Sequence, residues 1–282
     1  MPRLLPSPAA ALRRRLAREV HKVFHSGPDE PRVTRSSNAL MAPGSVAWRV
    51  HGDVTTMMVG GIAALLLQML HPAALAGVWD HSDFETDMLG RLRRTARFIA
   101  ITTYADRVQA EALIARVKAI HDRVDGTLLD GAHYSANDPA TLAFVHVAGE
   151  LSFLDAYIRF VEPGMSRSDQ DAYFAEVAGV AVALGADPVP TSRAAADALL
   201  ASFMPMLCAD DRSRRVRDLI LGAPVQHPSA APVQAMLMQA AVDLLPSHAR
   251  AMHALAPSRL TRPALNFATA GLSRTLRWAW SG

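Results

Sequence analysis

We single out six side chains with the chemistry to bind a metal ion or an anion within one apolar stretch, residues 71–146. They are His71, His81, Arg91, Arg94, His121 and His146. A neutral imidazole is the commonest metal ligand, and a guanidinium that leans into an apolar cavity needs an anion. We therefore interpret the stretch as the wall of a cofactor pocket, and these residue types are compatible with haem.

His121 is the strongest candidate for a ligand of iron. It lies four residues after Val117 and three before Val124, on the apolar stripe of a helix predicted over 106–125 and ended by Gly126. The predicted stripe consists of Ala110, Leu113, Val117, Ile120 and Val124. Burial there would keep the imidazole neutral, which ligation requires. A histidine in this position is either a haem ligand or a core residue with satisfied hydrogen bonds.

Arg91, Arg94 and Thr95 form an Arg-x-x-Arg-Thr group in a helix predicted over 88–104. At 100° per residue, Arg91 shares a helix face with Thr95 and Phe98, and Arg94 lies at the edge of that face. A haem propionate, a carboxylate side chain or an oxygen species would supply the anion that the arginines need. The alternative is that Arg91 pairs with a structural carboxylate while Arg94 reaches solvent.

His146 lies one helical turn before Glu150, within a helix predicted over 139–161. Asp138 is a suitable N-cap for this helix, which is apolar nearly all round and is therefore expected at the centre of the fold. His146 and Glu150 form either a buried hydrogen-bonded pair or a metal ligand with its supporting carboxylate.

His71 follows a second apolar helix, predicted over 54–70 and expected to be buried. Because His71 precedes Pro72 at a helix break, it acts either as a functional group or as a helix cap. Seven other histidines are expected at the surface or in loops: His21, His25, His51, His133, His227, His248 and His253.

The composition favours an all-α protein. Half of the 282 residues are hydrophobic and 20% are charged, which is enough apolar material for a sizeable core. Alanine, leucine and arginine are frequent, and clusters of β-branched residues are scarce. We expect one multi-helix domain over 46–282, preceded over 1–45 by a basic helix and an arm rich in Pro, Gly and Ser.

The net charge of +3 comes partly from the arginine-rich N-terminus. This basic segment indicates a solvated face or contact with a membrane surface, and no motif for nucleic-acid binding accompanies it. The single cysteine, Cys208, excludes an internal disulfide and a covalent CxxCH haem attachment. With no recognisable signal peptide, we expect a cytoplasmic protein with, at most, a peripheral membrane contact. The oligomeric state is not predicted.

Several well-known catalytic signatures are absent from the sequence. There is no Glu-x-x-His pair of the ferritin type, no HExxH, no GxSxG, no Walker A motif and no GxGxxG. The usual sequence marks of di-iron, zinc-protease, α/β-hydrolase and nucleotide-binding proteins are therefore missing.

The order of several sequence blocks resembles one protein family over about residues 46–255. The blocks are WRVHGDV, GGIAALLLQMLHPAALAGVWDHSDF, GRLRRT, TTYADRVQAEALIARVKAIHDRVDG, YSANDPATLAFVHVAGE and DLLPSHAR. They resemble the domain of unknown function 2236, the family that includes the rubber oxygenase latex clearing protein and the fungal oxygenase MpaB.

This resemblance implies a globin-like helical core around a non-covalent haem b with its iron. It implies oxidation by dioxygen of a small apolar substrate, such as an isoprenoid or alkene. His121, in IHDRVDG, would be the proximal iron ligand, and the Arg91–Arg94–Thr95 group would be catalytic on the distal side, with Arg91 also contacting the cofactor. His71 and His146 are further candidates for cofactor binding. A haem-binding sensor or carrier without turnover is the alternative.

The sequence departs from the family pattern at two positions. Arg94 stands where rubber oxygenases carry a lysine, and Ala105 stands where relatives often have glycine. Arginine stays protonated and is a poor iron ligand. No glutamate can be assigned to the base proposed for rubber oxygenase. We therefore expect a smaller substrate than polyisoprene.

Overall fold

A computed structural model describes residues 33–225, 231–257 and 269–271. In this part the chain is mostly helical, with one two-stranded sheet. The helices are α2 (Val46–His51), α3 (Val54–Gln68), α4 (Pro72–His81), α5 (Met88–Tyr104), α6 (Arg107–His121), α7 (Pro139–Phe160), α8 (Arg167–Leu184), α9 (Arg193–Phe203), α10 (Asp211–Leu221), α11 (Ala231–Leu244) and α12 (Ser247–Met252), with a 3-10 turn η1 (Met204–Met206) after α9. The basic helix expected near the N-terminus lies outside the described residues.

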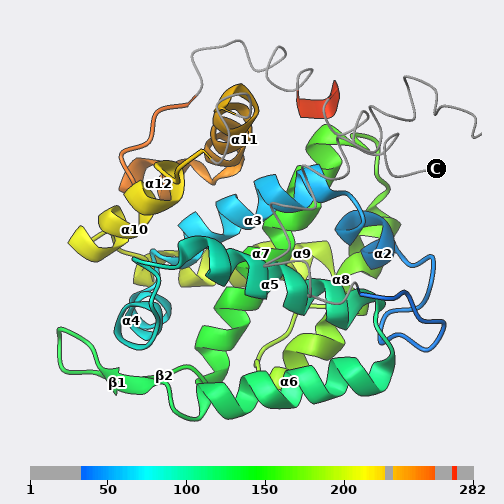
Figure 1. The fold of residues 1–282 in the computed structure, drawn as a ribbon, viewed down its shortest axis with the longest axis horizontal. Helices are drawn as coiled ribbons and strands as arrows, with labels where there is room; N and C mark the ends of the chain where they lie inside the picture. The colour runs from blue at the N-terminus through cyan, green and yellow to red at the C-terminus, as the bar shows by residue number, and fades with distance from the viewer. Residues whose placement is uncertain (1–32, 226–230, 258–268, 272–282) are drawn as a thin grey trace, which may run out of the picture.

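Helices α3 and α7 form the centre of the fold, with the other helices arranged around them (Figure 1). The close approach of the two helices depends on Gly60, because a Cβ there would lie 2.8 Å from the carbonyl oxygen of Ser152. α7 begins where the sequence predicts, and the Asp138 side chain accepts a hydrogen bond from the amide of Thr141. The predicted central helix, its cap and the burial of most of α3 are confirmed.

Among the described residues, α7 is the single helix long and apolar enough to cross a membrane. Of its most apolar window, 72% is buried inside the protein. α3 and α4 meet the same test only when taken together, and they are bent by 100° at the break between them. Core helices share this length and composition with membrane spans.

α7 supplies side chains to two hydrophobic clusters. One contains Leu66 of α3 and Phe144 of α7, and extends over α4 and α10 to α12. The other contains Leu154 of α7 and Tyr173 of α8, and extends over α2. Both clusters therefore depend on the same central helix.

α5 and α6 form a helical hairpin beside this centre. The bounds of α5 confirm the predicted helix over 88–104. α5 contacts mainly α6 and α2, whereas α6 contacts mainly α5 and α8, and Figure 1 shows α6 along the lower edge of the molecule. No residue of 91–101 is fully buried, although the segment includes Leu92 and Phe98. The described residues thus cover the apolar face of α5 only in part.

Residues 33–45 cross the turn that joins α5 to α6. The amide of Ser36 donates to the carbonyl of Tyr104 at 2.8 Å, and the amide of Arg107 donates to the carbonyl of Asn38 at 2.8 Å. Asp106, in the turn, accepts hydrogen bonds from the side chains of Ser36 and Asn38. The arm therefore fastens the closed end of the hairpin.

The segment after α6 differs from the prediction. α6 ends at His121, earlier than predicted, and the next residues form the antiparallel strands β1 (Asp125–Thr127) and β2 (His133–Ser135) instead of a loop. Gly126 does not end a helix but pairs with Tyr134, whose ring lies 2.8 Å from where a Cβ would be. The described chain is consistent with the expected all-α class, and this short hairpin replaces the expected loop.

Candidate functional site

His121 is the last residue of α6, and its side chain is half-buried. Its Nδ1 atom is buried and has no hydrogen-bond partner among the described residues. Burial lowers the pKa of His121; the charge of Asp122 raises it, and that of Arg91 lowers it further. The net lowering makes the imidazole neutral at pH 7, which is the form that binds a metal ion.

Arg91 lies in the first turn of α5 and is half-buried. Burial, and then the charge of Arg94, lowers the pKa of the Arg91 guanidinium, which nevertheless keeps its proton. No described carboxylate forms an ion pair with Arg91. The effect of Arg91 on the pKa of His121 shows that the two groups lie within electrostatic range. The structure therefore brings together the two residues that the sequence singled out most strongly.

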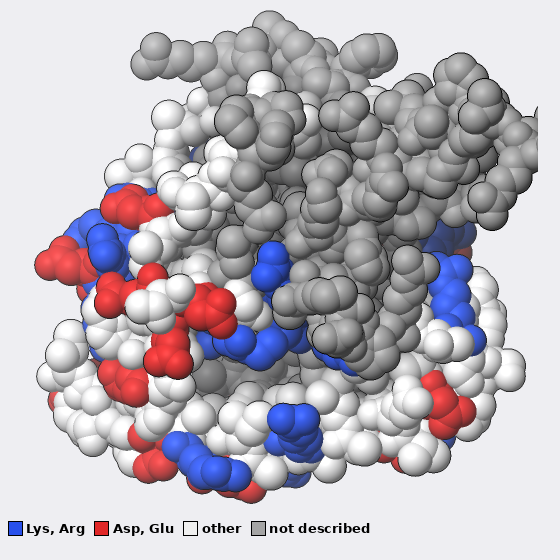
Figure 2. Space-filling view, viewed as in Figure 1, with Lys and Arg blue, Asp and Glu red and all other residues white. Residues whose placement is uncertain are grey.

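Arg94 and Thr95 take different positions from Arg91. Arg94 is exposed, and its guanidinium lies 3.0 Å from the Asp87 carboxylate, which also caps α5. Thr95 is exposed and donates its hydroxyl proton to the carbonyl of Arg91. Figure 2 shows basic side chains gathered where α5 crosses this face, with acidic side chains beside them over α4 and the segment that follows. The predicted catalytic group is thus divided between a half-buried arginine and two surface residues.

The apolar stripe predicted for α6 is partly wrong. Of its members, Ala110 is buried and Leu113, Val117 and Val124 are half-buried, but Ile120 is 50% exposed. The reason is the position of α6 at the edge of the fold, where it has extensive contact only with α5 and α8. Periodicity alone identified an apolar face without showing that the described residues leave Ile120, in its last turn, largely uncovered.

His71 acts as the N-cap of α4. Its Nδ1 accepts a hydrogen bond from the amide of Ala74 at 3.4 Å, and the ring stacks on Phe144 with centroids 4.7 Å apart. The residue is 3% exposed, and burial lowers its pKa more than the charge of Asp138 raises it. Of the two roles left open by the sequence, the capping role is confirmed.

Of the two alternatives for His146 and Glu150, the structure does not form the hydrogen-bonded pair. Nδ1 of His146 lies 3.9 Å from Oε1 of Glu150, beyond hydrogen-bonding distance, and Nε2 of His146 is buried without a partner among the described residues. Glu150 is held from the other side: Tyr173 donates its phenolic proton to Oε2, and Nε2 of His51 lies 3.5 Å from the same oxygen.

His51 was expected at the surface but is buried at the end of α2. Its Nδ1 lies 2.8 Å from the hydroxyl of Thr103, and its Nε2 lies 2.9 Å from the hydroxyl of Tyr173. These partners are 52 and 122 residues away in the chain, so no local pattern reveals them. One signal was present: His51 follows the buried Ala47 by four residues and therefore shares its helix face.

His253 was also expected at the surface and is fully buried. Its Nε2 donates to the carbonyl of Leu66, which is 187 residues away, at 2.7 Å. Burial lowers the pKa of His253 more than this hydrogen bond raises it.

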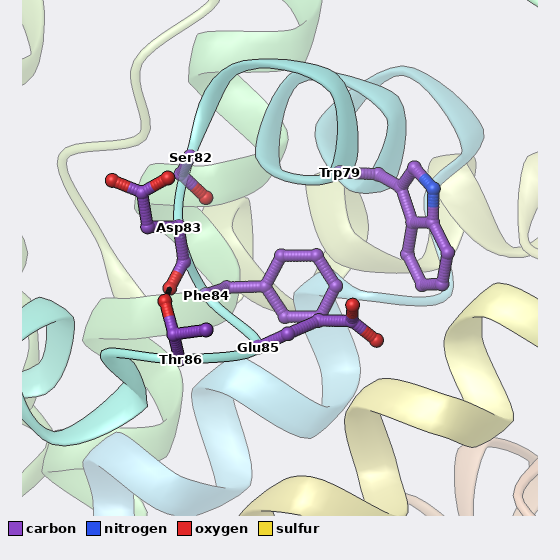
Figure 3. Close-up of a pocket in the computed structure, with 6 residues that line it drawn as sticks. All are labelled: Trp79, Ser82, Asp83, Phe84, Glu85 and Thr86. Carbon is purple, nitrogen blue, oxygen red and sulfur yellow. Dashed lines mark hydrogen bonds between the residues drawn. The ribbon is translucent and has the colours of Figure 1, made fainter.

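Two cavities of about 240 Å³ each lie away from Arg91 and His121. In the first, Trp79 and Phe84 face one another with ring centroids 5.1 Å apart, while the Asp83 carboxylate points away (Figure 3). The second lies where α3, α7, α9 and α11 meet. Both are smaller than the roughly 300–1,000 Å³ of typical ligand pockets.

The described residues contain no group of three His, Cys, Asp or Glu side chains that could hold a metal ion. A haem makes no such demand, because the porphyrin supplies four ligands and the protein needs to supply only one histidine. His121 alone would therefore be enough to hold a haem, whereas a bare metal ion would need further ligands.

Comparison with known proteins shows that the chain is an oxygenase-related helical protein. It belongs to the family described as ER-bound oxygenase mpaB/B′ and rubber oxygenase, catalytic domain, whose family model matches residues 48–278. No curated protein and no solved structure gives a significant match. The match confirms the family expected from the sequence blocks and covers most of the chain.

Proposed function

We propose that the protein is a haem-b-dependent oxygenase that uses dioxygen to oxidise a small apolar substrate of isoprenoid or alkene type. One relationship carries the proposal, that between His121 and Arg91. A neutral imidazole with a buried, unpartnered nitrogen lies within electrostatic range of a half-buried cation that no described carboxylate neutralises. Iron would satisfy the imidazole, and a propionate would satisfy the guanidinium.

Each side chain has a role in this proposal. His121 holds the iron, and its burial keeps the imidazole in the neutral form. Arg91 donates hydrogen bonds to a propionate or to dioxygen. Half-buried apolar residues of α5 and α6, such as Phe98 and Val117, would pack against the haem and keep water from it. When bound, the haem supplies the redox chemistry of dioxygen.

The remaining candidates are assigned to the margins of the site. We place Arg94 and Thr95 at the rim, because both are exposed on α5 beside Arg91. His146 stays a candidate cofactor contact because its buried Nε2 has no described partner. His71 has less support, since its Nδ1 already caps α4.

A second candidate function is a haem-binding sensor or carrier without turnover. The surface positions of Arg94 and Thr95 favour it, because the groups expected to assist catalysis bond to Asp87 and to the α5 backbone. Oxygen uptake separates the two functions. Haem-loaded protein that consumes oxygen when given an apolar alkene is an oxygenase, and protein that binds haem without consuming oxygen is a sensor or carrier.

Haem reconstitution tests the cofactor. We expect a Soret band in the absorbance spectrum of the full chain, and a loss of more than about 100-fold in haem affinity in His121→Ala, since changes in outer-shell partners alone cost about 10–100-fold. His133→Ala removes an exposed histidine of β2 and should bind haem as the wild type does. The absence of a Soret band in the wild type refutes the cofactor. A band that survives His121→Ala refutes the ligand.

The proposal also covers location and partners. We place the protein in the cytoplasm, in contact with a membrane surface through residues 1–45 and without a nucleic-acid partner. The basic charge of that segment is its support. Binding of the full chain to vesicles of anionic lipid, compared with a chain that lacks 1–45, tests it. If both chains bind the vesicles equally, the membrane contact lies outside residues 1–45.

A further inference from the structure

One chain of buried hydrogen bonds joins four helices. Thr103 on α5 contacts His51 on α2, His51 contacts Tyr173 on α8, and Tyr173 donates to Glu150 on α7. The side chain of His51 is 2% exposed, that of Glu150 is 15% exposed, and Tyr173 is fully buried. A charge in this chain must therefore be balanced within it.

Thr103 fixes one proton of His51. The hydroxyl of Thr103 donates to the carbonyl of Ile99 at 2.7 Å, so it offers His51 only a lone pair. Nδ1 of His51, at 2.8 Å from that hydroxyl, must then carry a proton. Whether Nε2 of His51 also carries a proton depends on Tyr173 and Glu150, at the other end of the hydrogen-bond chain.

Tyr173 has one phenolic proton and two neighbours, His51 and Glu150. If Tyr173 donates to a Glu150 carboxylate, then Nε2 of His51 must donate to the phenolic oxygen, and the ring is an imidazolium. If Glu150 is protonated, it donates to Tyr173, which donates in turn to a neutral His51. The two arrangements differ by moving two protons along the chain.

The surroundings favour the ionised arrangement. Burial raises the pKa of Glu150, but the hydrogen bond and charge of His51, with smaller effects of His146 and Tyr173, outweigh it and leave that pKa below its usual value. Burial and the charge of Glu150 raise the pKa of Tyr173 well above its usual value, so the phenol keeps its proton. The other carboxylate facing this region, Glu176, is already bonded to the first amides of α2.

We propose that His51, Tyr173 and Glu150 form a buried ion pair bridged by the phenol, and that this bridge positions α5 against α7 and α8. α5 has at most slight direct contact with either helix, because its main neighbours are α2 and α6. The hydroxyl of Tyr104 donates to the carbonyl of Trp48 at 3.0 Å, which ties α5 to α2 alone. Glu176 and the Arg49–Asp169 pair also tie α2 to α8, and His51 adds the link that continues from α5 through α2 to Glu150 on α7.

The bridge has a consequence for the candidate site. Arg91 lies on α5, so a bridge that fixes α5 also fixes the position of the Arg91 guanidinium relative to the centre of the fold. This step, unlike the bridge itself, rests on the proposed function. His51, Tyr173 and Glu150 are thus positioning residues, which act through α5.

Nitrogen-15 NMR of histidine-labelled full chain tests the ion pair without any cofactor. At pH 7, both ring nitrogens of His51 should carry protons, and Glu150→Gln should convert one of them to an unprotonated nitrogen. The His51 signals are assigned by their loss in His51→Gln. An unprotonated nitrogen on His51 in the wild type would overturn the ion pair.

Hydrogen exchange tests the positioning of α5. Tyr173→Phe removes only the bridging oxygen, and the amides in the last two turns of α5 should then exchange about tenfold faster, because buried charged groups lose their partner. His253→Gln is the matched control, since it alters an equally buried histidine that bonds to α3. Wild-type exchange in Tyr173→Phe, or equal acceleration in His253→Gln, would overturn the positioning role.

The two proposals fail separately. Both measurements use protein without added haem, so the lack of a Soret band would refute the proposed function and leave the bridge intact. Conversely, a neutral His51 in protein that binds haem through His121 would refute the bridge alone.

Discussion

The positive charge of Arg91, in the first turn of α5, lowers the pKa of His121, at the last residue of α6. The α5–α6 hairpin therefore brings a permanent cation and a neutral imidazole into range of one another. Because the interaction does not depend on a cofactor, it can be measured on the protein alone.

Removing the charge of Arg91 should raise the pKa of His121. Without a nearby cation, protonation of the imidazole is less unfavourable, and Arg91→Ala should shift the NMR titration of His121 to higher pH than in the wild type. Arg91→Lys keeps the charge and should retain most of the lowering. Arg94→Ala is the neighbouring control, because Arg94 pairs with Asp87. An unchanged titration in Arg91→Ala would place the two groups out of range.

The free energy of unfolding should fall as the pH is lowered from 7 to 5. Burial lowers the pKa values of His71, His146 and His253 below the ordinary value of 6.5. Protons then bind the unfolded chain more readily than the folded one, so stability is complete above about pH 6.5 and is lost progressively below it. Urea denaturation at several pH values measures the slope, which His146→Gln should flatten.

An exposed histidine provides the control for this slope. His133→Gln changes a surface residue of β2 and should leave the pH dependence as in the wild type. Glu150 acts in a separate, more acidic range: its stabilising effect is present above its ordinary pKa of 4.5 and is lost as the pH falls through its lowered pKa. A slope between pH 7 and 5 that His146→Gln does not alter would contradict the prediction.

Neighbouring glycines in α3 should respond oppositely to alanine. A Cβ at Gly60 would lie 2.8 Å from the Ser152 carbonyl oxygen and 2.9 Å from Cα of Phe153, so Gly60→Ala should destabilise the protein by about 1–3 kcal/mol. A Cβ at Gly61 meets only the Phe153 ring, at 3.7 Å, and Gly61→Ala should stabilise by about 0.5–1 kcal/mol. Urea denaturation compares the two, and equal stabilities would mean that α3 and α7 lie farther apart.

His71→Asn should leave haem binding unchanged while lowering stability. Asparagine is a good N-cap for α4, but it gives up the ring packing against Phe144 and Phe203, at a cost of about 2 kcal/mol. His71→Ala, which also loses the cap, should be about 1 kcal/mol less stable again. Urea denaturation measures the stability of each variant, and the Soret spectrum reports whether its haem binding has changed. A shifted Soret band in His71→Asn would mean that His71 contacts the cofactor after all.

Local signals predicted the long helices well. Asp138 and Pro139 define the start of α7 through a side-chain cap and a fixed φ angle, both of which depend only on adjacent residues. The β1–β2 hairpin was not predicted, because each strand has three residues, too few to show an alternating pattern. Its formation depends on pairing, such as that of Gly126 with Tyr134, rather than on propensity.

The candidate site was predictable only in part, for a different reason. Helical periodicity places Arg91 and Thr95 on one face, but it cannot say which part of that face another helix covers. Arg91 is half-buried and Thr95 is exposed because α5 lies at the side of the fold. His51 was misplaced because its burial depends on Thr103 and Tyr173, which only the folded chain brings near.

The arm of residues 33–45 closes one end of the α5–α6 hairpin, where it bonds to Tyr104 and Arg107. We therefore expect a small molecule that passes between the two helices to travel through the opposite end, where Asp87 and Asp122 flank the first turn of α5 and the last turn of α6. Entry and exit rates should then respond to substitutions at that end and be insensitive to substitutions in the arm.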